Sequence, residues 1–373
     1  MKVLILANND VGLYKFRKEL LEELLQPGSY LKGRKDEPCE VYISLPDGEY
    51  ISEMKNMGCH FIDTPLERHG TNPFQELKLK TTYKKIIKKV KPDIVFTYTI
   101  KPNIYGAMAC KNLKVPCVMN ITGLGTAVEN PGLMQKFMIM LYKKALSGVR
   151  KVFFQNSENR KFFTDRGMAI DKYDMLPGSG VNLDNYIVSP YPSEETIEFV
   201  FIARIMKEKG IDQYLDAARY IRKKYPQTRF HICGACEPEY NGELKKCQDD
   251  GTVIYHGLVK DIAAIHKVTH CTIHPTYYPE GLSNVLLEAC ASGRPIITTN
   301  RSGCREVIDD GINGYIVEQR NRDDLIKKIE QFINLPYEEK KAMGIAGRNK
   351  VEKEFDRKFV VKKYLEELKR NGL

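Results

Sequence analysis

The sequence predicts an α/β protein made of two doubly wound domains, each a parallel sheet covered by helices. The chain has 373 residues, more than one hydrophobic core usually serves. Short apolar runs alternate with amphipathic stretches along both halves, which is typical of parallel sheets. A turn-rich passage around residues 177–195 separates the halves. We therefore expect domains at 1–187 and 188–356, with a last helix in 357–373 that crosses back onto the first domain.

The first half is expected to start with a buried strand at residues 2–7, a turn that contains Gly12, and a helix that ends at Leu25. Further strands are expected at residues 41–45, 94–98, 117–121 and 152–155. A glycine in the first turn would let a phosphate approach the backbone closely. A full glycine-rich dinucleotide pattern is absent, so Gly12 alone also fits an ordinary turn.

The second half opens with an apolar run that ends in Arg204, and Lys209-Gly210 then leads into a helix. Arginine offers a planar fork and lysine a point charge to phosphate oxygens, so this pair suits a diphosphate. The alternative is two ordinary surface charges. Later strands are expected within residues 230–236, 253–257 and 271–275.

Two acids, Glu280 and Glu288, lie eight positions apart around the start of a predicted buried helix. The backbone amides of Gly281, Leu282 and Ser283 are expected to form an anion site at the start of that helix. A carboxylate in an apolar helix needs a charged partner or a ligand, and a sugar hydroxyl is one candidate for Glu288. The alternatives are a charge at the helix start for Glu280 and a half-buried salt bridge for Glu288.

The composition favours a cytoplasmic protein with anionic ligands. Lysine and arginine exceed the acids by ten, and no RNA- or DNA-reading motif is present. No apolar run is long enough to cross a membrane, and the first residues lack the features of a signal peptide. The ten cysteines have no framework spacing, so we expect no disulfides. The single CxxC at Cys233 and Cys236 has no second pair, so we expect no metal site.

Two stretches are candidates for contact with an anionic membrane surface. Residues 77–91 hold seven lysines with apolar residues at helical spacing, and residues 134–146 are rich in methionine and aromatic side chains. The alternatives are a solvated helix face for the first stretch and a core helix for the second.

The Glu-x7-Glu spacing resembles the retaining GT-B glycosyltransferases of group 1 (family 4 type). The resemblance extends over Arg204, Lys209-Gly210, Gly257 and Asp310-Gly-Ile-Asn-Gly314. The first half looks like the subgroup that elongates lipid-linked oligosaccharides and capsular or surface polysaccharides, through residues 11–17, 122–125 and 179–182. Many relatives have a histidine near the donor sugar, where this chain reads Asn120-Ile-Thr-Gly-Leu-Gly.

The resemblance implies two Rossmann-like domains that face each other across a cleft, with the acceptor on the first and the nucleotide sugar on the second. It implies retention of anomeric configuration with no metal and no cofactor. By the same resemblance, Arg204, Lys209 and Glu280 are catalytic, as the diphosphate clamp and the contact to the sugar hydroxyls. It further implies donor contacts by Gly12, Gly281, Leu282, Ser283 and Glu288, the last to the ribose, and an acceptor region at Thr122, Gly123 and Gly125.

The predicted reaction moves a hexose or N-acetylhexosamine from a UDP-sugar, with a GDP-sugar as the next choice, to a glycan. A glycan carried on undecaprenyl diphosphate is the expected acceptor, with peripheral contact to the inner face of the membrane. Two alternatives stay open. One is a nucleotide-sugar 2-epimerase, and the other is a scaffold that binds a nucleotide sugar without turnover.

Overall fold

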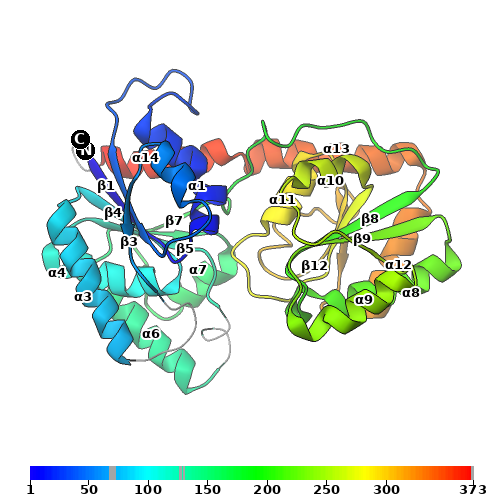
Figure 1. The fold of residues 1–373 in the computed structure, drawn as a ribbon, viewed down its shortest axis with the longest axis horizontal. Coiled ribbons are helices and arrows are strands. Elements are labelled where there is room, and N and C mark those ends of the chain that lie inside the picture. Colours follow the sequence, from blue (N-terminus) through cyan, green and yellow to red (C-terminus); the bar gives the residue numbers. More distant parts are fainter. Residues whose placement is uncertain (67–72, 126–127, 129–130, 371–373) are drawn as a thin grey trace. The chain divides into compact units, whose positions relative to one another are not determined.

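The computed structural model describes residues 1–66, 73–125, 128 and 131–370. The chain forms two compact units, one of Met1–Gly180 with Arg357–Leu373 and the other of Val181–Asp356 (Figure 1). Each unit contains one parallel sheet, of seven strands in the first and six in the second. Within the described residues, no helix is both long and apolar enough to cross a membrane.

The sheet of the first unit has its strands in the order β3-β2-β1-β4-β5-β6-β7. These strands are β3 (His60–Asp63), β2 (Glu40–Leu45), β1 (Lys2–Leu6), β4 (Ile94–Tyr98), β5 (Cys117–Ile121), β6 (Lys151–Phe154) and β7 (Tyr173–Met175). The central strands β4 and β5 are buried along their whole length, because helices cover both faces of the sheet. The strand order reverses between β1 and β4, and ligands of such sheets bind at the carboxyl ends of the strands near this switch point.

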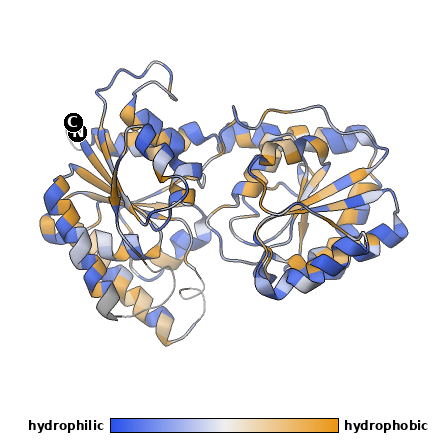
Figure 2. Ribbon diagram, in the orientation of Figure 1, coloured by the Kyte–Doolittle hydropathy of each residue, from blue (hydrophilic) through white to orange (hydrophobic). Residues whose placement is uncertain are grey.

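Helices cover both faces of this sheet. One face packs against α1 (Asp10–Leu25), α2 (Ile51–Asn56) and α14 (Arg357–Lys369). The other packs against α3 (Pro73–Val90), the π-helical turn η1 (Pro102–Gly106), α4 (Ala107–Leu113), α6 (Leu133–Leu146) and α7 (Ser157–Thr164). Figure 2 shows the resulting pattern of hydrophobic strands between helices of mixed character.

The prediction of a glycine turn after β1 is wrong. The side chain of Asn9 accepts a hydrogen bond from the amide of Gly12 at 2.6 Å and caps α1, which begins at Asp10. Gly12 therefore lies in the first turn of the helix, and its amide is already bound. A Cβ at this position would lie 2.9 Å from Oδ1 of Asn9, so the cap itself favours glycine here.

The last helix, α14, packs on the first unit through a buried ion pair. Both carboxylate oxygens of Glu19 accept hydrogen bonds from Nη1 of Arg357, at 2.8 and 2.7 Å. Arg357 also donates to the carbonyl oxygen of Gly180 at 3.0 Å. Further along α14, the hydroxyl of Tyr364 accepts a hydrogen bond from Nδ2 of Asn120 at 2.6 Å. These contacts tie the end of the chain to α1 and to the carboxyl end of β5.

The sheet of the second unit has the order β10-β9-β8-β11-β12-β13. Its strands are β10 (Ile254–Tyr255), β9 (Thr228–Cys233), β8 (Ile197–Ile202), β11 (Cys271–His274), β12 (Ile296–Thr299) and β13 (Gly314–Val317). One face packs against α8 (Ile211–Lys224), α9 (Asn241–Asp249) and α12 (Arg322–Ile333). The other packs against α10 (Ile262–Val268) and α11 (Asn284–Ala291), and α13 (Tyr337–Glu354) packs on α11. The predicted doubly wound fold is confirmed, and the switch point of this sheet lies between β8 and β11.

Candidate active site

The loop after β8 carries Arg204 and leads to the short 3-10 helix η2 (Lys207–Lys209). Its path depends on Gly234, which follows the neighbouring strand β9 with a φ of 146°. A Cβ on Gly234 would lie only 1.9 Å from the carbonyl oxygen of Ala203. Glycine is therefore required for the two loops to run this close, and the contact fixes the backbone just before Arg204.

A second close contact brings the loops after β8 and β11 together. Gly210 has a φ of 79°, and a Cβ there would lie 2.2 Å from the carbonyl oxygen of Pro275. The carbonyl oxygen of Glu208 accepts hydrogen bonds from the amide of Tyr277 at 2.9 Å and from the hydroxyl of Thr276 at 3.2 Å. The side chain of Lys209 is therefore held next to the loop that leads to Glu280.

Lys209 and Glu280 form a largely buried ion pair, with side-chain exposures of 13% and 15%. The carboxylate is also 3.7 Å from Nε2 of His274, a buried residue at the end of β11. The sequence predicted both members of the pair as site residues but gave no reason to expect direct contact between them. Contact arises because the two loops meet at the switch point.

The surroundings of Glu280 keep it ionised. Burial by itself would raise its pKa, but the positive charge of Lys209 and the nearby imidazole of His274 outweigh that effect and lower the pKa to about 2. At neutral pH this carboxylate therefore accepts hydrogen bonds and does not donate a proton.

Tyr278 lies next to both predicted cations. The Nζ atom of Lys209 is 4.8 Å from the centre of the Tyr278 ring, and the guanidinium carbon of Arg204 is 6.0 Å from it. Both distances fall within the range of cation–π attraction. Arg204 is exposed and also lies 3.6 Å from a carboxylate oxygen of Glu237. The structure thus brings Arg204 and Lys209 to one aromatic ring.

The start of α11 is held by a hydrogen bond to another loop. Ser283 is the residue before the helix, and its amide donates to the carbonyl oxygen of Gly303 at 2.7 Å. Of the three amides predicted to form an anion site, this one is therefore already engaged within the protein. Glu288 lies within α11 on the same partly exposed side as Asn284 and Val285, while the rest of the helix is buried.

The other predicted residues belong to the first unit. Thr122, Gly123 and Gly125 follow β5, and Gly125 has a φ of 70°. A Cβ on Gly125 would lie 3.1 Å from Cδ1 of Ile100, so this loop lies beside the loop that follows β4. The loop after β4 and the start of α1 near Gly12 follow the two strands that flank the switch point of the first sheet, and the loop after β5 follows the next strand.

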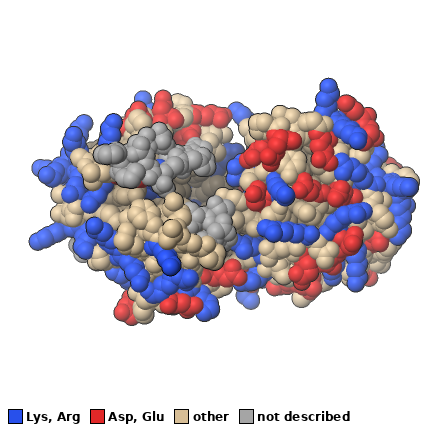
Figure 3. Space-filling view, turned by 90° about the horizontal axis from the view of Figure 1, so that it is seen from below, with Lys and Arg blue, Asp and Glu red and all other residues tan. Residues whose placement is uncertain are grey.

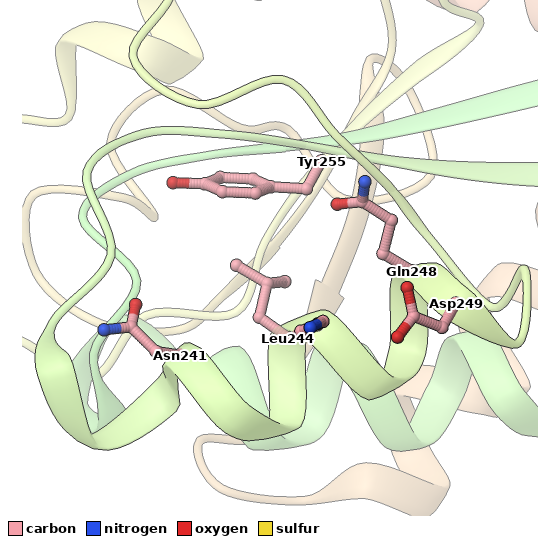
Figure 4. Close-up of a pocket in the computed structure, with 6 residues that line it drawn as sticks. Asn241, Leu244, Gln248, Asp249 and Tyr255 are labelled. Atoms are coloured by element: carbon pink, nitrogen blue, oxygen red, sulfur yellow. The ribbon is translucent and has the colours of Figure 1, made fainter.

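A pocket of about 230 Å³ lies between α9 and β10 in the second unit (Figure 4). Asn241, Leu244, Lys245, Gln248, Asp249 and Tyr255 line it. None of these is a predicted site residue. The hydroxyl of Tyr255 donates to the carbonyl oxygen of Gly234 at 2.9 Å, so the residue supports the loop beside Arg204.

The cysteines form no disulfide bonds. All ten cysteines are free thiols, and nine of them are buried. In the part of the chain that the structure describes, no three His, Cys, Asp or Glu side chains come together in a way that could hold a metal ion.

Sequence reasoning did not single out His274, Tyr278 or Gly234. His274 carried a usable signal, because a histidine that ends an apolar strand lies at the ligand-binding edge of a parallel sheet. Gly234 carried a weaker one, as a glycine directly after a strand. Nothing in the sequence indicated that Tyr278 would contact two cations from another loop.

Comparison with known proteins shows similarity to glycosyltransferases. Residues 186–350 match the family model described as glycosyl transferases group 1, and residues 29–156 match the model described as glycosyl transferase 4-like. A Campylobacter jejuni protein named N,N'-diacetylbacillosaminyl-diphospho-undecaprenol alpha-1,3-N-acetylgalactosaminyltransferase is 25% identical over 98% of this chain and 97% of its own. An Escherichia coli protein named UDP-Gal:alpha-D-GlcNAc-diphosphoundecaprenol alpha-1,3-galactosyltransferase is 26% identical over 68% of this chain and 70% of its own.

Solved structures show the same fold. The Anabaena protein HepE in complex with UDP and glucose is similar with a TM-score of 0.80, 16% identity and coverage of 99% of this chain and 100% of that one. A glycosyltransferase from Rickettsia africae is similar with a TM-score of 0.80, 20% identity and coverage of 99% and 98%. The chain is a glycosyltransferase with the GT-B fold, and each of its two units contains the region matched by one glycosyltransferase family model.

Proposed function

We propose that the protein is a retaining hexosyltransferase that acts on a lipid-linked glycan. It transfers a hexose or N-acetylhexosamine from a UDP-sugar to an acceptor carried on undecaprenyl diphosphate, in the synthesis of a surface polysaccharide or related glycan. The observation that carries the proposal is the group of Arg204, Lys209 and Glu280 at the switch point of the second sheet. The names of the Campylobacter and Escherichia relatives, both of which specify diphospho-undecaprenol acceptors, support the choice of acceptor.

In this reaction the bond between the anomeric carbon and the diphosphate breaks, and negative charge develops on the leaving oxygens. Arg204 and Lys209 stabilise that charge with charge-assisted hydrogen bonds. Lys209 is held in place by Glu280, and an ammonium group has three donors, so it can bind a phosphate oxygen without losing the carboxylate. Two positive side chains thus take the part that a metal ion plays in other transferases, and the proposed reaction is independent of metal.

Glu280 acts in this proposal as an acceptor of hydrogen bonds from the sugar hydroxyls, a role that suits a carboxylate with a pKa of about 2. Glu288, on the partly exposed side of α11, binds the ribose hydroxyls. The backbone of Gly281 and Leu282 contacts the sugar or the phosphate. Ser283 keeps its amide bond to the protein and fixes the end of this segment.

The first unit supplies the acceptor side. Thr122, Gly123 and Gly125 contact the acceptor glycan. Gly12, whose amide is bound to Asn9, contributes to the donor side only by its lack of a side chain. The enzyme works in the cytoplasm at the inner face of the membrane that holds the lipid carrier.

The test is a calorimetric and thermal-shift screen of UDP-, GDP- and ADP-sugars against the wild type, Glu288→Ala and Glu339→Ala, the last an exposed glutamate of α13 as a control. A donor that binds the native state raises its stability by mass action. We expect one UDP-sugar to bind the wild type and the control but not Glu288→Ala.

Activity then follows with that donor and a lipid-linked acceptor, and the anomeric configuration of the product is determined by NMR. Release of nucleotide only when acceptor is present separates a transferase from an epimerase. If no nucleotide sugar binds, the protein is not a transferase of this kind. An inverted product would remove the retaining mechanism while leaving the donor assignment intact.

A further inference from the structure

Asn120 makes a group of hydrogen bonds inside the first unit. It lies next to the last residue of β5 and is 1% exposed. Its side-chain nitrogen donates to the hydroxyl of Tyr364 in α14 at 2.6 Å, and its side-chain oxygen accepts from Nε2 of Gln155 at 3.4 Å. Its backbone oxygen accepts from Nδ2 of Asn103 at 2.8 Å. Three segments of the chain therefore hold this one buried residue, and they satisfy an amide that would be costly to bury without partners.

The same hydrogen bonds hold the loops that follow β4 and β5. Asn120 is two residues before Thr122, where the predicted acceptor region begins. Asn103 belongs to the π-helical turn η1 after β4, and its side-chain oxygen accepts from the hydroxyl of Thr97 at 2.7 Å. Between Thr97 and Asn103, Thr99 has a φ of 69°, which is strained for a β-branched residue. Backbone strain and π-helical turns persist where surrounding contacts enforce them, and both are common at functional sites.

The ring of Tyr364 is held in one position. It is 1% exposed and meets the rings of Phe96 and Phe153 edge-on, with centres 5.0 Å apart in each case. The guanidinium carbon of Arg17 lies 5.8 Å from the ring centre, within cation–π range. The hydroxyl of Tyr142, which is equally buried in this unit, has no hydrogen-bond partner among the described residues. The bond from the end of β5 is therefore a particular feature of Tyr364.

Helix α14 has other contacts that dock it on the first unit. It begins with the buried pair of Arg357 and Glu19, and its apolar side chains join the core of this face. One turn after Tyr364, the carboxylate of Glu367 lies 3.6 Å from Nε of Arg150, which precedes β6 and so lies at the amino edge of the sheet. The bond from Tyr364 instead joins α14 to the carboxyl edge, where parallel sheets bind their ligands.

We propose that Tyr364 is a positioning residue for the acceptor. Through Asn120 it fixes the carboxyl end of β5, and thereby the start of the loop that carries Thr122, Gly123 and Gly125. The groups around Asn120 are neutral and buried, whereas Figure 3 shows charged side chains across the surface of the molecule, so Tyr364 acts through the loop and meets no substrate itself. The link to the acceptor rests on the proposed function, but the hydrogen bonds do not depend on it.

Steady-state kinetics of Tyr364→Phe test the inference, with the donor found in the screen and a lipid-linked acceptor. The substitution keeps the packed ring and removes the hydroxyl, so Asn120 loses one bond. The KM for the acceptor should rise about tenfold, the size expected for one buried hydrogen bond, while the calorimetric affinity for the donor stays unchanged. KM does not depend on the concentration of active enzyme. A purely structural role, which would only reduce the amount of folded protein, would therefore not change it.

Two variants serve as controls. Tyr142→Phe removes a buried hydroxyl that has no partner in the described part of the chain, and Arg150→Gln weakens the contact of α14 at the opposite edge of the sheet. Both should keep the acceptor KM of the wild type. Asn120→Ala should raise that KM at least as much as Tyr364→Phe, and the double variant should raise it no further, because both substitutions break the same bond. Thermal unfolding checks that each variant is folded at the assay temperature.

The inference is overturned if Tyr364→Phe keeps the wild-type KM for the acceptor, or if either control raises that KM as much. It is also overturned if the effects of Asn120→Ala and Tyr364→Phe multiply, because the two side chains would then act independently. Donor binding separates this failure from a failure of the proposed function. If the wild type binds no nucleotide sugar, the proposed function fails and this inference fails with it. If the wild type binds the donor and transfers the sugar, an unchanged KM in Tyr364→Phe overturns this inference alone.

Discussion

Removing the carboxylate of Glu280 tests the buried pair with Lys209. The pKa of Glu280 falls from an ordinary 4.5 to about 2 on folding. Each unit of pKa corresponds to about 1.4 kcal/mol, so the ionised carboxylate contributes about 3 kcal/mol to the free energy of unfolding at neutral pH. Glu280→Gln should lose at least about this much, because it also leaves the ammonium of Lys209 largely buried without its partner.

The sign of the pH dependence follows from the lowered pKa. The contribution of the Glu280 carboxylate is fully present above the unfolded pKa of 4.5 and is lost as the pH falls from there toward 2. The difference in unfolding free energy between wild type and Glu280→Gln should therefore shrink as the pH falls from about 4.5 toward 2. Urea unfolding followed by circular dichroism measures it. A difference that stays unchanged as the pH falls from 4.5 to 2 would refute the reasoning.

A double-mutant cycle with Lys209→Met completes the test. Each single variant leaves one buried charge unpaired, so the double variant should cost less than the sum of the two by about 2 kcal/mol or more. The control is the pair Lys161–Asp165, which is exposed and should show a coupling below about 1 kcal/mol. Additive losses at Lys209 and Glu280 would mean that the pair contributes nothing to stability as a pair.

Three further substitutions probe other parts of the structure. Arg357→Met should lower the free energy of unfolding in urea by about 3–5 kcal/mol, because it breaks a buried ion pair. Its control, Lys363→Met, breaks a half-exposed ion pair and should lower it by less than about 1 kcal/mol. Gly234→Ala should lower the free energy of unfolding by at least about 3 kcal/mol, since its methyl group would lie 1.9 Å from a backbone oxygen. Its control, Gly251→Ala, has open space around the added methyl group and should lower it by about 1 kcal/mol. Tyr278→Leu should raise the KM for the donor about tenfold with kcat little changed. Tyr278→Phe keeps the ring and should behave like the wild type. A fall in kcat alone for Tyr278→Leu would contradict a positioning role.

Most of the fold follows from hydrophobic periodicity in the sequence. The central strands β4 and β5 were predicted with their observed bounds, because strands buried on both faces appear as unbroken apolar runs. The strands β3 and β7 were not predicted. Both are short and partly exposed, so neither gives a continuous apolar signal.

The prediction for the start of α1 was wrong for a local reason. Gly12 was interpreted as part of a turn, since glycine is common in loops between strands and helices. Asn9 is a favoured cap residue three positions before Gly12, and a capped helix start was therefore also consistent with the sequence. The close approach of the Asn9 side chain explains why a glycine stands inside the first turn here.

The site was only partly predictable for a different reason. Arg204 and Lys209 could be selected because their residue types and spacing fit a diphosphate, and Glu280 because the Glu-x7-Glu spacing resembles that of the GT-B glycosyltransferases. The ion pair between Lys209 and Glu280 could not, because it joins loops that are distant in sequence and meet only when β8 and β11 become neighbours. The contact of Tyr278 with both cations depends on the same meeting of loops.

The chemistry at the two switch points supports the proposed division of labour between the units. At the carboxyl ends of β8 and β11, the side chains include the cations Arg204 and Lys209, which suit a diphosphate. In the first unit, Thr122 follows β5 and offers a neutral hydroxyl group, which suits the uncharged hydroxyls of a sugar, whereas the side chains of Asn9 and Thr99 are already bonded within the protein. The cations beside β8 and β11 therefore fit the proposed placement of the anionic donor on the second unit, because each phosphate charge there meets a positive group.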